Sequence, residues 1–246
     1  MISSFFFTTL YQPLYNGLIF LIDIIPYRDA GLAVVSLTII VKLILFPLSK
    51  KAVRTQLILK QVQPEVDSLK EKHKDDKQAQ AQAMMGLYKE KGINPFSSFF
   101  LILIQLPIIL TLYRIFVGSG LPEVNTDILY YFVPTPETVD TIFLGFIDIG
   151  SRSVLLAVAA AVTSFFQIRY SVPPHQTKEG AAGTFKDDLA RSMNVQMRYV
   201  FPAIVLFIAY GISGAVALYW TTSNLFMIAQ ELYMRKRVKP LLEKSE

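Results

Sequence analysis

A lysine lies inside a long apolar segment, where charges are rare and are most often functional. Lys42 stands in the apolar run of residues 30–49, eight positions before Lys50. At about 1.5 Å per helical residue this separation is roughly 12 Å. A lysine stem covers only part of that distance, so reaching the aqueous boundary by snorkelling is strained. Because a charge inside a bilayer is costly, we interpret Lys42 as a cation that faces water in a cavity between helices.

Hydroxyl and amide side chains lie within the other apolar segments, and with Lys42 they predict a polar groove. Each of them taken singly is better explained by ordinary interhelical hydrogen bonding, which is typically worth about 0.6 kcal/mol. As a set around a cation, they favour a groove that holds water or an anionic group. The residues predicted to line the groove are Lys42, Gln105, Ser164, Gln167, Thr222 and Asn224.

The residue types needed for catalysis or metal binding are missing or scattered. The chain has no cysteine, and its two histidines, His73 and His175, lie far apart in polar segments. No Gly-rich phosphate loop, His-Glu-x-x-His motif or Gly-x-Ser-x-Gly motif occurs. Carboxylates are almost absent from the apolar segments, whereas a proton-coupled transporter usually carries one deep inside. The sequence therefore predicts a protein that is not an enzyme and has no metal site and no cofactor.

Composition places these residues in a membrane. Of the 246 residues, 52% are hydrophobic and 17% are charged, against about 25% charged in an ordinary soluble domain. Several apolar runs approach the roughly 20 residues that a bilayer requires. We therefore predict an all-α integral membrane protein with five transmembrane helices around the polar groove. The predicted spans are residues 30–49, 96–117 and 153–168, followed by two within residues 195–234 that turn at Ile212, Ser213 and Gly214.

The distribution of charge predicts the orientation of these spans. Twenty of the 24 Lys and Arg residues fall in residues 50–95, 169–198 and 235–246, all on one side of a five-span topology. Residues 118–151 contain five acidic residues and no basic one. By the positive-inside rule, residues 50–95, 169–194 and 235–246 are cytoplasmic and residues 118–152 form an outer loop. The N-terminus is then outside and the C-terminus is in the cytoplasm.

Residues 1–29 are predicted to form an amphipathic helix on the outer face of the membrane. Leu14, Leu18, Leu21 and Ile25 recur at helical spacing. The segment between Pro13 and Pro26 is shorter than the roughly 20 residues that a span needs. An interfacial helix fits this length. The alternative is a sixth span, which would reverse the termini and break the charge rule.

The two longest cytoplasmic segments are predicted to contact partners. Residues 50–95 form a helical hairpin, in which Met84, Leu87 and Tyr88 give an apolar stripe that can receive varied apolar segments. The alternative is a helix pair that packs against itself and lipid headgroups. Residues 235–246 form a basic tail that binds either the phosphates of ribosomal RNA or anionic lipid. Its contact residues are predicted to be Arg235, Lys236, Arg237 and Lys239.

Four short motifs occur in a recognisable order along nearly the whole chain. The motifs are the run Gly31–Leu48 with Lys42 and Pro47; Gln63-Pro64-Glu65; Asn94-Pro95 followed by Gln105-Leu106-Pro107; and Ala217–Asn224 followed by Gln230. Each motif is weak alone. Together with five spans and a charged first cytoplasmic segment, they resemble the YidC/Oxa/Alb family of membrane protein insertases, and bacterial members without a large periplasmic domain in particular. Lys42 stands where the family usually has arginine, which keeps the charge but loses bidentate carboxylate binding.

The resemblance implies a function in the bacterial plasma membrane that involves no catalysis. A groove open to the cytoplasm and to lipid would use Lys42 to attract acidic residues in a substrate tail, and the apolar substrate segment would leave sideways into lipid. Implied partners are nascent membrane proteins and membrane lipids, with the ribosome, the signal recognition particle pathway and the Sec translocon as further candidates. The alternative function is a small-solute or anion channel or transporter with Lys42 as its binding site.

Overall fold

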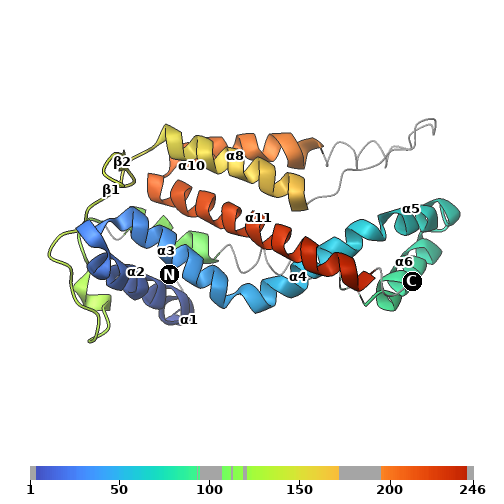
Figure 1. Cartoon of the computed structure of the whole chain (residues 1–246), viewed down its shortest axis with the longest axis horizontal. Coiled ribbons are helices and arrows are strands. Elements are labelled where there is room, and N and C mark those ends of the chain that lie inside the picture. Colours follow the sequence, from blue (N-terminus) through green and yellow to red (C-terminus); the bar gives the residue numbers. More distant parts are fainter. Residues whose placement is uncertain are drawn as a thin grey trace. The chain divides into compact units, whose positions relative to one another are not determined.

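A computed structural model describes residues 4–92, 94, 107–111, 113–118, 121–171 and 195–242 of the chain. These residues are mostly helical, which confirms the predicted all-α class (Figure 1). The chain divides into two compact units. The first contains Met1–Ile44 and Leu106–Ile228, and the second contains Leu45–Gln105 and Ala229–Glu246.

The N-terminal helical stretch is longer than the sequence indicated. It runs without a break through α1 (Ser4–Phe6), the π-helical turn η1 (Phe7–Tyr11) and α2 (Gln12–Ile24). Pro13 does not interrupt it, because the proline directly follows the π-helical turn η1, where the usual i→i−4 hydrogen bonds of the helix are already replaced. The stretch therefore has 21 residues and is long and apolar enough to cross a membrane. The prediction that the helix in residues 1–29 is shorter than a membrane span is therefore wrong.

The first predicted span ends earlier than expected. α3 (Ala30–Ile44) begins after the short 3-10 turn η2 (Pro26–Arg28), and a new helix, α4 (Phe46–Gln61), follows Leu45. Pro47 lies in the first turn of α4, where its missing N–H group and its ring disfavour continuation of the preceding helix. The predicted run of residues 30–49 is therefore two helices.

In the first unit, α8 (Val154–Ser171) lies beside α10 (Phe201–Gly211) (Figure 1). The N-terminal half of α11 (Gly214–Leu242) contacts α8 through Asn224. The buried residues of α8 and α10 include three alanines: Ala157, Ala160 and Ala209. Small residues let membrane helices approach closely, so that dispersion contacts hold them together. The predicted turn at residues 212–214 is confirmed, since α10 ends at Gly211 and α11 begins at Gly214.

The loop between the second and third predicted spans contains short elements that the sequence did not indicate. A 3-10 turn, η4 (Thr126–Ile128), precedes strands β1 (Ile142–Phe143) and β2 (Ile147–Asp148). The two strands pair antiparallel, with Ile142 opposite Asp148. Residues 140–151, called the β-hairpin segment below, also form a parallel bridge between Asp140 and Asp29.

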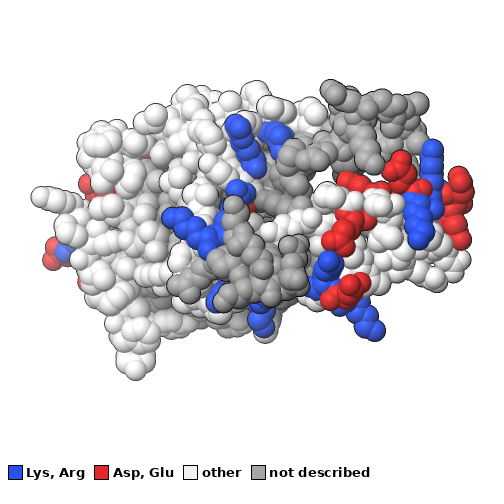
Figure 2. Space-filling model, turned by 45° about the vertical axis from the view of Figure 1, so that its right-hand side comes forward, with Lys and Arg blue, Asp and Glu red and all other residues white. Residues whose placement is uncertain are grey.

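In the second unit, α5 (Gln63–Lys72) and α6 (Lys77–Glu90) form a helical hairpin. The predicted hairpin of residues 50–95 thus has its first arm divided between α4 and α5, with Pro64 in the first turn of α5. α11 continues as one helix through the predicted basic tail to Leu242. Charged side chains of both signs lie on the helical hairpin, whereas the visible surface of the first unit is mostly uncharged (Figure 2).

Two helices of the described residues meet the length and composition of a membrane span: Ser4–Ile24 and Val154–Ser171. The broken pair Ala30–Ile44 and Phe46–Leu59 adds a third if it counts as one span. Pro107–Phe116 and Gln196–Gly211 are apolar but shorter, and part of the span predicted at residues 96–117 lies outside the described residues. The five-span topology therefore stays a prediction.

Candidate functional site

Burial along α3 changes one turn before Lys42. The buried residues of this helix end at Leu37 and Thr38. Lys42 itself is half-buried. The first unit therefore encloses the N-terminal part of α3 and leaves the part around Lys42 open. The large apolar side chains exposed on α3 all lie in its last six residues: Ile39, Ile40, Leu43 and Ile44.

Four helical segments converge just N-terminal to Lys42 on α3. Val41 and Thr38 line a small interior space together with Tyr219 of α11. Its other lining residues come from α2, from α3 and from the helix Pro107–Phe116: Leu14, Leu37 and Ile108. Thr38 Oγ1 donates to the Val34 carbonyl at 2.6 Å, so its proton is satisfied within α3. The lining is mostly apolar, so this small space offers little polar surface next to Lys42.

Two of the predicted groove residues are brought together by the fold. Asn224 Nδ2 donates to Ser164 Oγ at 2.8 Å and to Thr163 Oγ1 at 3.2 Å. Ser164 and Asn224 are both buried. These bonds join α8 to α11 and use polar groups that were predicted to face the groove. Thr163 was missed by the sequence reasoning, although its position beside Ser164 is a signal for a paired contact.

The remaining predicted groove residues make contacts within their own helices or lie outside the described residues. Gln167 Nε2 donates to Ser171 Oγ at 3.0 Å, and Thr222 Oγ1 donates to the Leu218 carbonyl at 2.8 Å. Both residues are half-buried. Gln105 lies outside the described residues.

A buried carboxylate ties the start of α3 to the β-hairpin segment. Asp29 is 4% exposed. Its Oδ1 accepts from the Leu32 backbone N–H at 2.9 Å, which caps α3, and its Oδ2 accepts from the Leu144 N–H at 2.8 Å. Leu144 has φ of 53°, in the left-handed region that a leucine rarely adopts, so Asp29 also holds a strained turn. The position of Asp29 directly before an apolar run was a sequence signal for this cap.

The β-hairpin segment contacts both α3 and α11. A Cβ on Gly31 would overlap the ring of Phe143, so glycine is required for β1 to lie on α3. On the other side, Gly214 N donates to the Ser151 carbonyl at 2.7 Å, and Ala215 N donates to the Ile149 carbonyl at 2.9 Å. The segment therefore joins the N-terminal ends of α3 and α11.

Asp148 stabilises the return strand of this segment. Burial alone would raise the pKa of Asp148, but hydrogen bonds from Ser151, Gly150 and Thr141 hold that pKa below its usual value. The carboxylate is therefore ionised at neutral pH and keeps the strand end in place.

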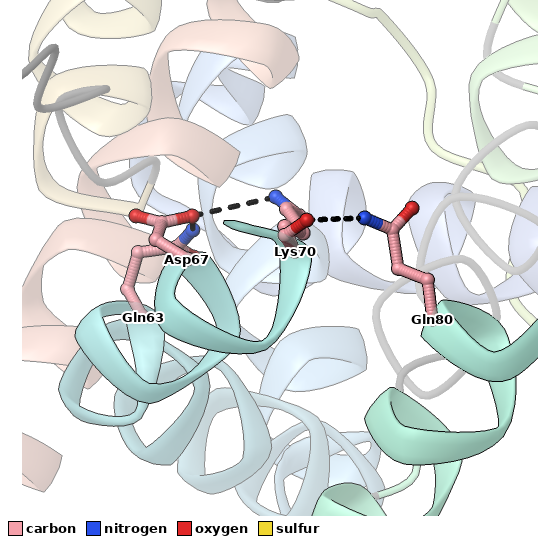
Figure 3. A network of polar contacts seen from close by, with 4 residues as sticks. All are labelled: Gln63, Asp67, Lys70 and Gln80. Carbon is pink, nitrogen blue, oxygen red and sulfur yellow. Dashed lines mark hydrogen bonds and ion pairs between the residues drawn. The ribbon is translucent and has the colours of Figure 1, made fainter. Parts of the chain in front are cut away.

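A polar network stabilises the helical hairpin (Figure 3). Asp67 accepts from Gln63 Nε2 at 2.9 Å and pairs with Lys70 at 3.4 Å, and Gln80 Nε2 donates to the Lys70 carbonyl at 2.9 Å. Asp76 caps α6 by accepting from the N–H groups of residues 78 and 79. These contacts fix the loop between α5 and α6.

The predicted apolar stripe of α6 packs mainly inside the helical hairpin. Leu87 is buried in a cluster with Val62 and Val66, and Met84 and Tyr88 pack against that cluster. Burial, with Asp67 adding to it, raises the pKa of Tyr88. This packing corresponds to the alternative in which the helix pair packs against itself. A substrate would reach Leu87 only if the helical hairpin opened.

The end of α11 is held by contacts within the second unit. Gln230 Nε2 donates to Ser49 Oγ at 2.7 Å, and Met234 packs with Val53 and Leu57 of α4. Arg235 pairs with the buried Glu231 at 2.9 Å. Lys236 is exposed and carries its charge at the surface, whereas the side chains of Arg237 and Lys239 lie outside the described residues.

Comparison with known proteins identifies the family. The profile of the 60Kd inner membrane protein family matches residues 21–242. A protein of Clostridium tetani named membrane protein insertase YidC is 30% identical over 212 residues, covering 86% of this chain and 84% of that protein. A protein of the same name from Clostridium acetobutylicum is 29% identical over 233 residues, covering 91% and 81%. A third, from Rickettsia massiliae, is 27% identical over 84% of this chain but only 35% of its own length.

The chain belongs to the YidC/Oxa/Alb family. The resemblance seen in the sequence is thereby confirmed, and the family description places the chain among inner-membrane proteins. The matched range includes α3 with Lys42, the helical hairpin and all of α11.

We expect the contact between Asn224 and Ser164 to stabilise the first unit. Asn224→Ala and Ser164→Ala should each lower the free energy of unfolding in detergent, with a coupling of about 0.6 kcal/mol and at most about 1.7 kcal/mol in a double-mutant cycle. Thr222→Val is the matched control, because Thr222 bonds only to its own helix among the contacts described. Additive effects of the two alanine variants would show that the bond contributes nothing.

Proposed function

We propose that the chain is a membrane protein insertase, which helps apolar segments of other proteins to enter the bilayer. Family membership over residues 21–242 and the name shared by its relatives support this function. The observation that supports it most directly is the burial along α3. Side chains of α3 are buried up to Thr38, and exposed ones begin at Ile39, close to Lys42. A groove that ends inside the membrane requires such a change from a closed to an open part of the bundle.

In this mechanism Lys42 attracts the carboxylates of a short hydrophilic tail on the substrate. Two opposite charges 4 Å apart attract by about 1 kcal/mol in water and by about 4 kcal/mol at an effective dielectric constant near 20. The partly enclosed position of Lys42 therefore strengthens the attraction. The exposed apolar side chains next to it, Ile39, Ile40 and Leu43, give the substrate segment a path into lipid.

The basic segments are proposed to be cytoplasmic, so that the Lys42 end of α3 faces the cytoplasm. The β-hairpin segment then lies outside, where its bonds to α3 and α11 close the bundle. This arrangement lets a substrate tail enter from the cytoplasm without opening a path through the membrane. The charge distribution of the three basic segments supports it.

The helix Ser4–Ile24 is proposed to lie at the outer interface, although its length suits a span. The middle of this helix is covered by an irregular loop, since Asn16 Nδ2 donates to the Ile128 carbonyl at 2.9 Å and Tyr15 Oη accepts from Asn125 N at 2.7 Å. The same loop carries the exposed Asp127. Irregular backbone and exposed charge are not tolerated against lipid hydrocarbon. The loop also satisfies the buried amide of Asn16, since the Tyr130 N–H donates to Asn16 Oδ1.

The helical hairpin and the end of α11 are proposed to meet the substrate or ribosome. Met85, exposed on α6, is available without opening the hairpin, whereas Leu87 is not. On α11, the exposed Lys236 is better placed than the paired Arg235 to bind RNA phosphates or anionic lipid. Nascent membrane proteins are thus the proposed principal partners, with the ribosome, the signal recognition particle pathway and the Sec translocon as further ones.

The insertase function is tested with purified protein in liposomes. We expect a radiolabelled single-span substrate with a short acidic tail to become protected from external protease several-fold more in these liposomes than in protein-free ones. Chloride and glutamate efflux should stay at the protein-free level. Flux of either anion without substrate protection would instead support the channel alternative with Lys42 as its site.

A further inference from the structure

An aromatic turn protrudes from the loop that covers α2. It consists of residues 130–133, and Tyr131 and Phe132 are 101% and 63% exposed. Their rings contact each other edge to face with centroids 5.4 Å apart, and Tyr130 stacks on Phe132 at 5.4 Å. The Val133 N–H donates to the Tyr130 carbonyl at 2.9 Å, which closes the turn. Two large aromatic side chains are therefore presented on an ordered backbone.

This turn is fixed to the face of α2. The Tyr130 N–H donates to Asn16 Oδ1 at 2.6 Å, and Gln12 Nε2 donates to the Ile128 carbonyl at 3.2 Å. Asn16 is 2% exposed, so this anchor is shielded from competing water. The position of the aromatic turn along α2 is thus set by side chains of α2 itself.

The row of α2 residues that continues from the anchor is apolar and exposed. Phe20 and Ile24 follow Asn16 at intervals of four residues, which places all three on one side of the helix. Phe20 is 44% exposed and Ile24 is 57% exposed. Because the Tyr130 N–H bonds to Asn16, the aromatic turn and this row are two exposed apolar features on the same side of α2.

We propose that the aromatic turn inserts into the headgroup–acyl boundary of the bilayer and anchors α2 with its covering loop at that depth. Tyrosine and phenylalanine rings suit this boundary, where one end of the side chain is apolar and the other is wet. Residues 118–151 have no Lys or Arg, so the ligand is the apolar boundary of a zwitterionic lipid surface and not an anionic headgroup. The exposed Asp127 keeps the loop backbone at the boundary and out of the hydrocarbon.

The test uses tryptophan fluorescence and does not depend on insertase activity. Trp220 is the only tryptophan, so Trp220→Phe gives a background without tryptophan. We expect Tyr131→Trp in this background, reconstituted in phosphatidylcholine vesicles, to lose most of its emission when the lipids are brominated near the top of the acyl chains. Iodide in the buffer should quench it little. Thr135→Trp, an exposed position in the same loop, is the matched control and should show the opposite pattern.

Two outcomes would overturn the proposal. One is iodide quenching of Tyr131→Trp equal to that of Thr135→Trp, with no effect of brominated lipid. The other is protection from iodide in native membranes but not in vesicles, which would assign the turn to a protein partner. Phe132→Trp gives the same readout if the Tyr131 variant does not fold, and elution as a monodisperse species in detergent establishes folding for each variant.

Discussion

Insertion of substrates with acidic tails falls about tenfold or more when Lys42 is replaced by alanine or glutamate, and is retained when it is replaced by arginine. This expected result follows from the half-buried position of Lys42 at the open end of α3. An attraction of only about 1.4 kcal/mol, well within the range for a partly desolvated ion pair, corresponds to a factor of ten. Protease protection of the substrate in liposomes measures the effect.

The partner of this charge is identified by changing the substrate as well. Neutralising the acidic residues of the tail should shrink the difference between the unmutated protein and Lys42→Ala, and the double-mutant cycle gives the coupling directly. Thr222→Val, a change in a half-buried hydroxyl bonded to its own helix, is the control for altered polarity alone. If Lys42→Ala impairs acidic and neutral tails equally, the lysine hydrates the groove and does not bind the tail. If it impairs neither, Lys42 is a tolerated buried lysine.

Asp29→Ala is expected to destabilise the first unit by about 1.5 to 5 kcal/mol. The variant loses the cap of α3, which is worth about 0.5 to 2 kcal/mol, and leaves the Leu144 N–H without its acceptor, which costs about 1 to 3 kcal/mol. Denaturant unfolding in detergent measures the loss. Hydrogen exchange should rise most in residues 140–151, because the β-hairpin segment is held to α3 by this carboxylate.

Asp29→Asn separates the two roles of the carboxylate. Asparagine keeps one carbonyl oxygen to cap α3 but offers no second acceptor to Leu144, so its cost should lie between zero and that of alanine. Asp127→Ala is the control. It removes an exposed carboxylate from the loop that also carries Leu144, and it should change the free energy of unfolding by less than about 0.5 kcal/mol. Equal stability of Asp29→Ala and Asp127→Ala would contradict the importance of the buried contact.

The sequence alone determined the membrane class and the family, and it predicted Lys42 as a cation within the membrane. These follow from properties that act locally along the chain: apolar run length, the side on which basic residues gather, and short motifs around Lys42, Gln105 and Asn224. The turn at residues 212–214 could also be predicted. The apolar residues within 195–234 are too many for one span, and Gly214 lies near their middle.

The tertiary structure alone decided what most polar side chains do. Asn224 and Ser164 each suit a groove by type, but they bond to each other across 60 positions of sequence. Asn16 sits in an apolar helix and is satisfied by a loop more than 100 residues later, and Leu87 of the apolar stripe is buried in the hairpin core. Helical periodicity shows which face a residue occupies but not which segment covers that face. Asp29 was readable as a helix cap, yet its second bond, to Leu144, depends on a β-hairpin segment that no local pattern places against α3.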